Sequence, residues 1–262
     1  MRKADGSLRI CIDYRKVNEV TVTENYPMPN LNKCIYRANN VKLFTKLDLV
    51  RGYYQVPIDP DSRPITAFST MNNHYQFKRL SFGLKNSGMA FQKTMQQILS
   101  PILTSNIIIY IDDVLIMSES FEDHIKLIEK VLSTLMRNGV KIKTSKCEWF
   151  KSEVTFLGHV INSSGIRKSP EYVEKVLRIE KPRTVKELRQ FLGLINFQRK
   201  FIEKCSLLTK PLSLCTVGPK NKKICWNPEM EECFENLKKE VAKDVLLTYP
   251  DYTEGANKLN SL

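Results

Sequence analysis

The sequence predicts a mixed α+β fold, in which short strands form a sheet and the C-terminal part is helical. Three observations favour this class. Short runs rich in apolar and β-branched side chains at 43–49 and 107–117 are typical of strands. Segments at 87–99 and 120–139 repeat an apolar residue every three or four positions, which indicates helices. After residue 168 the chain changes to a series of capped helical segments.

Composition limits the class of protein. The 262 residues are 42% hydrophobic and 26% charged, which suits one large or two modest folded domains and excludes a disordered chain. The formal charge of +13 favours a polyanionic partner such as nucleic acid, although many basic proteins have none. Seven scattered cysteines without a CxxC pair argue against a disulfide framework and a zinc knuckle. We therefore expect an intracellular protein, and no apolar run is long enough to predict a membrane span.

The N-terminal third begins with an expected hairpin and leads to one strand. Residues 1–16 place Asp5 and Gly6 between two basic arms, a pattern typical of a tight β-turn. The apolar segment 43–49 is expected to be a strand that enters the core and stops before Gly52. Asp48 would then lie at the exit of this strand.

The middle of the chain predicts a helix followed by a hairpin. Ser87 is the expected N-cap of a helix over 87–99, and Pro101 would end it. Two apolar runs at 107–111 and 114–117 are separated only by Asp112 and Asp113. This is hairpin spacing, so we expect both aspartates to occupy the turn.

The remaining elements are mostly helical. Ser120 with Asp123 predicts the start of a helix that Gly139 ends, and residues 156–161 suit a strand closed by a turn at 162–165. Three further helix starts are predicted by capping patterns at 169–170, 184–187 and 227–228. Residues 253–262 are polar and aperiodic, so a frayed tail is expected.

The carboxylates carry the chemical prediction. An Asp-Asp pair alone is most simply an exposed turn, but near a core two carboxylates need a cation. If the strand that ends at Asp48 neighbours the hairpin, three carboxylates converge and form an all-oxygen site suited to Mg²⁺. Two such ions about 4 Å apart can activate a 3′-hydroxyl and stabilise a leaving pyrophosphate. That is the chemistry of a polymerase.

Several segments then resemble the ordered reverse transcriptase motifs of gypsy-type LTR retrotransposons. The resemblance begins at residue 3, extends to about Tyr252, and is carried by segments 9–18 (RICIDYRKVN), 44–55 (FTKLDLVRGYYQ), 82–86 (FGLKN), 110–113 (YIDD), 146–148 (KCE), 156–159 (FLGH) and 191–197 (FLGLINF). The motifs occur in the family's order and spacing.

The resemblance implies a right-hand polymerase with partial fingers, a palm sheet that carries the catalytic aspartates, and a helical thumb. On this basis residues 1–168 are expected to form partial fingers and palm, 169–215 the thumb, and 216–252 a tether toward an RNase H domain. Residues 253–262 would be a disordered tail. We expect a fragment of a retrotransposon Pol polyprotein that lacks the first strands of the fingers and contains no RNase H, protease or integrase.

The resemblance also assigns the metal site. Asp48 and Asp112 match the carboxylates that bridge two Mg²⁺ ions, with Mn²⁺ as an alternative. Asp113 completes the site, and the Leu49 carbonyl is a further backbone ligand. Lys146 matches a lysine that protonates the leaving pyrophosphate.

Other matching positions contact the nucleotide. Tyr53 matches the sugar gate that selects dNTPs, and Phe82 opens the helix that supports the nucleotide and the template. Lys3 and Arg9 match fingertip residues that close over the triphosphate. Without the resemblance, Tyr53 would more often be a core aromatic residue, and the two basic residues would be surface charges.

The nucleic acid is expected to meet a second group of residues. The segment Phe156, Leu157, Gly158 and His159 resembles the strand turn that grips the primer terminus. Gln190, Arg199 and Lys200 are predicted to meet phosphates, although an ordinary solvated helix face explains them as well. The chain departs from the family pattern at Ser81, where proline is usual, and over residues 87–90, where the family has Ala-Pro-Ala-Thr.

The sequence therefore predicts an RNA-directed DNA polymerase that adds dNTPs to a primer on an RNA or DNA template. A catalytically inactive nucleic-acid-binding remnant of a retroelement is the main alternative. An RNA-dependent RNA polymerase is a second alternative, which the match at Tyr53 and the YIDD sequence weigh against.

Overall fold

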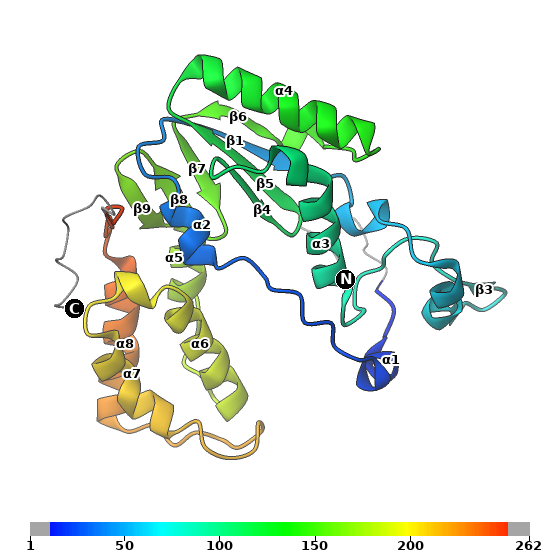
Figure 1. Ribbon diagram of the computed structural model, residues 1–262. Coiled ribbons are helices and arrows are strands. Elements are labelled where there is room, and N and C mark those ends of the chain that lie inside the picture. The colour runs from blue at the N-terminus through cyan, green and yellow to red at the C-terminus, as the bar shows by residue number, and fades with distance from the viewer. Residues whose placement is uncertain (1–10, 251–262) are drawn as a thin grey trace. The chain divides into compact units, whose positions relative to one another are not determined.

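The computed structural model describes residues 11–250, which form two compact units divided between Val154 and Thr155. The first unit contains a mixed set of helices and antiparallel strands, and the second contains a small sheet and a group of helices (Figure 1). The predicted α+β class is confirmed. The expected N-terminal hairpin, including Lys3 and Arg9, lies outside the described residues, as does the expected tail.

A four-stranded antiparallel sheet is the centre of the first unit. Its strand order is β4-β5-β1-β6, and the strands are β1 (Leu43–Asp48), β4 (Ile107–Tyr110), β5 (Asp113–Ser118) and β6 (Glu148–Lys151). The apolar residues of β1, β4 and β5 are almost all buried, because this part of the sheet is covered on both faces. The strand predicted to end at Asp48 is confirmed.

Two long helices cover one face of this sheet (Figure 1). Helix α3 (Ser87–Leu99) contributes its buried apolar residues to the same core as helix α4 (Phe121–Arg137). Helix α4 begins as predicted, since the Ser120 hydroxyl accepts a hydrogen bond from the Asp123 amide. The prediction for α3 was wrong by one residue: its N-cap is Asn86, and the Ser87 hydroxyl instead donates to the Ser81 carbonyl.

The hairpin between β4 and β5 also differs from its prediction. Asp113 is the first residue of β5 and pairs with Tyr110, so only Ile111 and Asp112 remain in the turn. Ile111 has a φ of 51°, a left-handed conformation that costs a branched side chain about 1–2 kcal/mol. The turn is therefore tighter than the spacing of the two apolar runs suggested.

The first unit also contains shorter elements. They are the helices α1 (Arg15–Val20) and α2 (Leu31–Tyr36), the single-turn or short 3₁₀ helices η1 (Gly52–Gln55), η2 (Pro60–Thr66), η3 (Ser100–Ile102) and η4 (Thr144–Lys146), and the small hairpin β2 (Phe68–Ser69) with β3 (His74–Tyr75).

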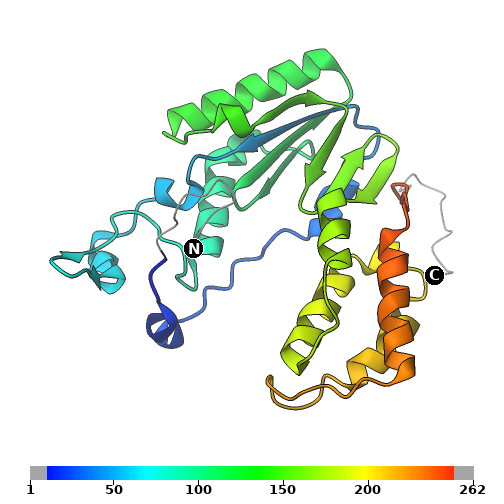
Figure 2. The same ribbon diagram turned by 180° about the vertical axis from the view of Figure 1, so that it is seen from behind.

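The second unit combines a three-stranded sheet with four helices. The strands β7 (Glu153–Phe156), β8 (His159–Asn162) and β9 (Gly165–Lys168) pair in order. The helices are α5 (Pro170–Leu177), α6 (Val185–Phe197), α7 (Cys205–Leu214) and α8 (Pro228–Ala242), with the 3₁₀ turn η5 (Arg199–Phe201) after α6. Figure 2 shows α5, α6, α7 and α8 from behind, and one buried apolar cluster joins all four.

The helix starts in this unit follow their capping patterns. Ser169, Thr184 and Asn227 each accept a hydrogen bond from a backbone amide of the first turn of the following helix. The single strand predicted over 156–161 was wrong, because the chain turns at Leu157 and Gly158 between β7 and β8. The predicted turn at 162–165 is confirmed, since Asn162 pairs with Gly165. Within residues 11–250, no helix combines the length and the apolar character that a membrane span requires.

Candidate active site

Asp48 and Asp113 are paired directly across two neighbouring strands. They are the last register pair between β1 and β5, and directly opposed residues of an antiparallel pair point to the same face of the sheet. Both side chains are half-buried. Leu47 and Val114, the neighbours of the two aspartates in sequence, point into the core under α3 and α4. Because successive side chains of a strand point to opposite faces, the two carboxylates belong to the other face of the sheet.

The charges around Asp113 favour a cation. Burial raises the pKa of Asp113, and the charges of Asp48 and Glu148 raise it further, while Lys46 opposes them. Lys46 also forms an ion pair with Glu148, with 3.4 Å between Nζ and Oε1. Burial together with the charges of Asp48 and Glu148 outweighs the effect of Lys46, so the ionised form of Asp113 remains unfavourable in the folded protein.

Asp112 lies in the turn beside Gly52. A Cβ placed on Gly52 would be 2.3 Å from Asp112 Oδ1 and 3.0 Å from Cζ of Phe91, which is closer than real Cβ atoms come. Only glycine therefore lets η1 approach the Asp112 carboxylate this closely. Asp112 also contributes, after burial, to the raised pKa of Tyr53, so the carboxylate and the phenol are electrostatic neighbours.

Gln92 holds the backbone on both sides of Tyr110, and the sequence did not single it out. It is 0% exposed within α3. Its Nε2 donates to the Ile109 carbonyl at 3.0 Å, and its Oε1 accepts from the Ile111 amide at 2.6 Å. The amide of Gln92 thus fixes the strained residue that precedes Asp112. A polar residue on the buried face of a predicted helix was the signal that could have found it.

The donor set suits a hard divalent cation. Among residues 11–250, no three His, Cys, Asp or Glu side chains are gathered closely enough to hold a metal ion in a protein cage, so the expected convergence of Asp48, Asp112 and Asp113 is not found. Mg²⁺ does not need such a cage, because it is commonly held by one or two carboxylates together with substrate phosphates and water. The carboxylate pair Asp48 and Asp113, with excess negative charge and Asp112 in the adjoining turn, fits this mode of binding.

The segment after α4 is tied to the strand end that carries Asp48. The Lys143 amide donates to the Asp48 carbonyl at 2.8 Å, and the Val50 amide donates to the Lys141 carbonyl at 3.0 Å. These bonds form the bridge between Leu49 and Ile142. Lys146 follows in η4, and its side chain is exposed.

Aromatic rings pack together beside the start of α3. The Tyr53 ring lies 4.7 Å from the Phe82 ring and stacks on Phe91 at 5.3 Å, measured between centroids. A Cβ on Gly88 would lie 3.5 Å from the Tyr53 hydroxyl, so the phenol reaches across the first turn of α3. The structure thus brings Tyr53 and Phe82, two residues of the predicted nucleotide-binding set, into contact.

Asn18 shapes the loop that follows Phe82. Its Nδ2 donates to the Gly83 carbonyl at 2.7 Å, and its Oδ1 accepts from the Lys85 amide at 2.8 Å. Gly83 has a φ of 95°, a conformation that favours glycine. The loop is therefore held by a residue that precedes it by 65 positions.

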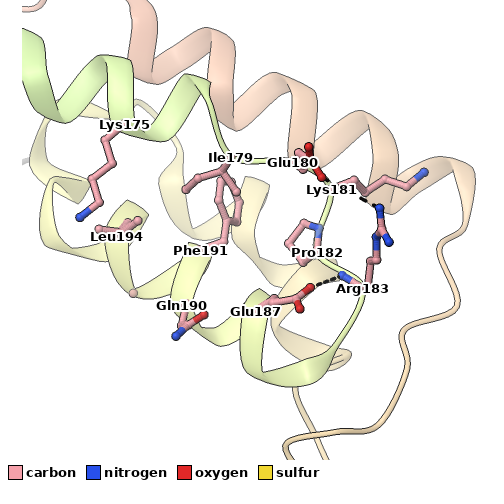
Figure 3. A pocket seen from close by; sticks show the side chains of 11 residues that line it. Lys175, Ile179, Glu180, Lys181, Pro182, Arg183, Glu187, Gln190, Phe191 and Leu194 are labelled. Atoms are coloured by element: carbon pink, nitrogen blue, oxygen red, sulfur yellow. Dashed lines mark hydrogen bonds and ion pairs between the residues drawn. The ribbon is translucent and has the colours of Figure 1, made fainter. Parts of the chain in front are cut away.

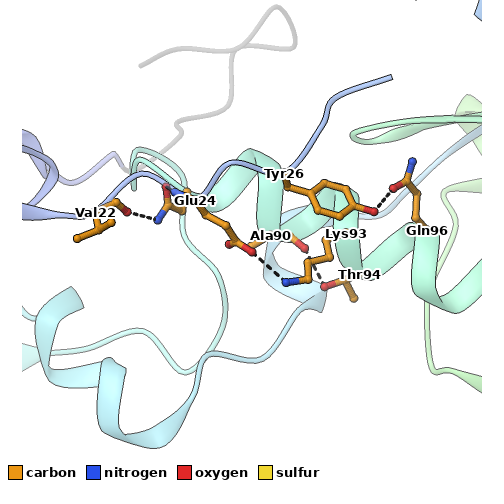
Figure 4. Close-up of polar contacts among 8 residues, drawn as sticks. Val22, Glu24, Tyr26, Ala90, Lys93, Thr94 and Gln96 are labelled. Atoms are coloured by element: carbon orange, nitrogen blue, oxygen red, sulfur yellow. Dashed lines mark hydrogen bonds and ion pairs between the residues drawn. The ribbon is translucent and has the colours of Figure 1, made fainter. Parts of the chain in front are cut away.

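The chain after Asn18 continues along α3 as an extended strap, residues 21–26. Figure 4 shows its contacts with the helix: Glu24 forms an ion pair with Lys93 at 2.9 Å, and Tyr26 donates to Gln96. The side chain of Asn86 bonds both the Val22 carbonyl and the Glu24 amide. The strap, which is not part of the sheet, thus holds α3 at its N-cap Asn86 and further along the helix at Lys93 and Gln96.

The second unit presents the predicted primer-contacting segment as a tight turn. Leu157 and Gly158, hereafter the 157–158 turn, are half-buried, and Phe156 and His159 on either side are buried. The His159 ring contacts Phe197 and Phe201. Burial, with a smaller contribution from Lys200, lowers the pKa of His159 to about 4, so this imidazole is neutral at physiological pH.

The predicted phosphate contacts of the second unit differ in their surroundings. Gln190 is exposed and lines a groove of about 890 Å³ between α5, the 179–183 loop and α6 (Figure 3). Arg199 is exposed and donates to the Ser206 hydroxyl at 3.3 Å. Lys200 is half-buried over the Phe201 ring, and burial lowers the pKa of its amine to about 8.

Known proteins with similar sequences are retroelement polyproteins. Residues 1–161 match the family described as reverse transcriptase (RNA-dependent DNA polymerase). The retrovirus-related Pol polyprotein from transposon 297 of Drosophila melanogaster is 37% identical over 255 residues, which are 96% of this chain and 24% of that protein. The corresponding polyprotein from transposon gypsy of the same species is 33% identical, over 93% of this chain and 24% of its own length. The chain thus spans about a quarter of these relatives.

Solved structures give the same result. A foamy viral protease-reverse transcriptase bound to double-stranded DNA superposes with a TM-score of 0.86 at 30% identity, over 96% of this chain and 44% of that one. A complex of the foamy viral enzyme with an RNA/DNA hybrid gives a TM-score of 0.81 at 30% identity, over 93% of this chain and 33% of the other. The family match covers more than half of the sequence and includes both strands that carry the aspartates. The chain therefore belongs to the reverse transcriptase family.

Proposed function

We propose that this chain is an RNA-directed DNA polymerase that adds dNTPs to a primer 3′-hydroxyl by two-metal phosphoryl transfer. The observation that carries the proposal is the cross-strand pair of Asp48 with Asp113, with Asp112 in the β4–β5 turn directly before Asp113. The Pol polyproteins that share this sequence and the foamy viral enzymes that share the fold support it.

Asp48, Asp112 and Asp113 would hold two Mg²⁺ ions, or Mn²⁺ in their place, with the Leu49 carbonyl as a backbone ligand. When bound, the ions would lower the pKa of the primer hydroxyl and offset the charge on the pyrophosphate. Lys146 supplies a proton to the leaving group from η4. Asp113 stays ionised in this state, because cations replace the neighbouring carboxylates as its dominant electrostatic partners.

Tyr53 and Phe82 select the nucleotide. Their packed rings form a wall at the start of α3, and a deoxyribose packs on the Tyr53 ring where a ribose 2′-hydroxyl would collide. Gly83 lets the backbone approach the nucleotide closely. Lys3 and Arg9 close over the triphosphate from the N-terminal segment.

The nucleic-acid partner is a primer paired with an RNA or DNA template. The foamy viral enzymes are described in complexes with double-stranded DNA and with an RNA/DNA hybrid, and the charge of +13 suits such a polyanion. We assign the primer terminus to the 157–158 turn with Phe156 and His159, and duplex phosphates to Gln190, Arg199 and Lys200.

Primer extension on an RNA template with Mg²⁺ tests this function. We expect dNTP addition by the wild-type chain, and its loss in Asp48→Asn and Asp112→Asn with duplex affinity unchanged within about twofold. Glu153→Gln, which removes an exposed carboxylate, is the matched control and should extend normally. Duplex binding without extension by the wild-type chain would instead favour a catalytically inactive remnant, and preference for rNTPs would favour an RNA polymerase.

A further inference from the structure

The backbone of the 157–158 turn is in an unfavourable conformation. Leu157 has a φ of 50° and Gly158 a φ of 78°. A two-residue hairpin loop with positive φ at both positions usually has Asn-Gly or another pair that tolerates this region. Glycine does so here, but leucine resists it because its Cβ clashes with the backbone. The turn therefore needs contacts from outside to keep its shape.

Two side chains hold the carbonyl groups of this turn. His159 Nδ1 donates to the Leu157 carbonyl at 2.9 Å, and Gln198 Nε2 donates to the Gly158 carbonyl at 2.9 Å. The Ser169 amide also donates to the Gly158 carbonyl, at 3.2 Å. Gln198 is 0% exposed and follows directly after the last residue of α6.

The end of α6 also packs against the turn. A Cβ on Gly158 would lie 3.2 Å from Cε1 of Phe197 and 3.7 Å from Nε2 of Gln198. There is thus little room for the turn to move toward the helix, and the amide of Gln198 restrains the Gly158 carbonyl from the same side. The hydrogen bond and the close packing together fix the turn to α6.

We propose that Gln198 is a positioning residue, which holds the strained 157–158 turn in the shape that presents the primer 3′ end. The assignment of the turn to the primer rests on the proposed function. Gln198 itself touches no reacting atom. It acts through the Gly158 carbonyl, and it links the turn to the end of α6, between the predicted phosphate contacts Gln190 in α6 and Arg199 and Lys200 in η5.

The test compares Gln198→Met with Tyr172→Phe in the full chain. Methionine keeps the length of glutamine but cannot donate a hydrogen bond. Tyr172→Phe removes a bond of 2.8 Å from the buried Tyr172 hydroxyl to the Leu194 carbonyl in the same unit, so it matches the loss of a buried hydrogen bond without touching the turn. Amide hydrogen exchange over residues 156–160 and single-nucleotide addition under saturating dNTP are measured for both.

We expect exchange over 156–160 to quicken about tenfold in Gln198→Met and to stay within twofold in Tyr172→Phe. The maximal rate of addition should fall about ten- to a hundredfold in Gln198→Met, with the KM for dNTP nearly unchanged, because the primer rather than the nucleotide is misplaced. Equal exchange in the two variants, or equal rates of addition, would overturn the proposal.

Two further variants complete the design. Gln198→Asn is one methylene too short to reach Gly158, so it should reproduce both effects if the methionine variant does not fold. In a Leu157→Asn background the strain is relieved, since asparagine tolerates positive φ, and Gln198→Met should then change the exchange less than threefold. A wild-type chain that extends no primer would refute the proposed function and with it the effect on addition, whereas the exchange measurements alone would still decide whether Gln198 holds the turn.

Discussion

Asp48 lies directly opposite Asp113 in the ladder between β1 and β5, at the point where both strands leave the core. Burial and the charges of Asp48 and Glu148 raise the pKa of Asp113. The folded protein therefore binds this proton at a higher pH than the unfolded chain does. Ionisation of Asp113 therefore destabilises the fold: the stability falls as the pH rises from the unfolded-state pKa of about 3.9 to the folded-state pKa, and the loss is complete above the folded-state pKa.

Replacement of Asp113 by asparagine should stabilise the metal-free protein while it removes activity. We expect a higher midpoint of thermal unfolding for Asp113→Asn at pH 7 in EDTA, and a difference that shrinks as the pH falls toward 4. Single-nucleotide addition should fall at least about a hundredfold. Calorimetry at both pH values checks the stability, with Glu153→Gln as the exposed control. An unchanged midpoint of thermal unfolding at pH 7 would show that burial and the neighbouring charges do not destabilise ionised Asp113.

Gly52→Ala should displace the Asp112 carboxylate. The new Cβ would meet Asp112 Oδ1 at 2.3 Å and Phe91 at 3.0 Å, so the turn or the start of η1 must shift. We expect addition to slow at least about tenfold, since small displacements of catalytic groups are costly. Gly88→Ala is the control, because its Cβ would make only an ordinary contact of 3.5 Å with the Tyr53 hydroxyl. Equal rates for the two variants would contradict this account.

Gln92→Leu should weaken both the fold and the site. The change leaves the Ile109 carbonyl and the Ile111 amide without their side-chain partner, and each buried polar group left unsatisfied costs about 1–3 kcal/mol. Chemical denaturation should report a loss of about 2–6 kcal/mol for the two groups together. Gln97→Leu, on the exposed side of the same helix, should cost less than about 0.5 kcal/mol. The rate of nucleotide addition by Gln92→Leu should fall by more than the fraction of unfolded protein accounts for.

Binding to template-primer should be phosphate-directed and sensitive to salt. If roughly five phosphates are neutralised, log affinity should fall with log salt at a slope of about −4. Arg199→Ala with Lys200→Ala should make the slope shallower by about one or two units. Filter binding at salt concentrations from about 50 to about 300 mM checks this. An unchanged slope in the double variant would place both residues outside the path of the nucleic acid.

Lys200 adds a dependence on pH to the same prediction. Because burial lowers the pKa of this amine to about 8, it is mostly neutral at pH 9 in the free protein. A phosphate partner would restore the charge, so binding at pH 9 should take up about one proton. Calorimetry in buffers of different ionisation enthalpy measures the uptake, and Lys200→Ala should abolish it. No uptake by the wild-type chain would mean that Lys200 meets no phosphate.

The elements that carry the aspartates could be predicted because each has a strong local signal. Apolar runs marked β1, β4 and β5, and a capping pair marked the start of α4. The local pattern predicted an unbroken strand through Leu157 and Gly158, because leucine gives no turn signal, and only the resemblance to the family placed a turn there. The turn is held by a hydrogen bond from Gln198, 40 positions away. Helix α7 was not predicted either, since it contains Pro211. Local preferences fail where distant contacts decide the backbone.

The strap over residues 21–26 has a consequence for the order of folding. Its contacts with α3 join residues 62 to 70 positions apart, so a large loop must close before any of them forms. During synthesis the strap cannot complete its contacts until Gln96 has left the ribosome. Docking of the strap is therefore a late step, which follows the synthesis of almost all of α3.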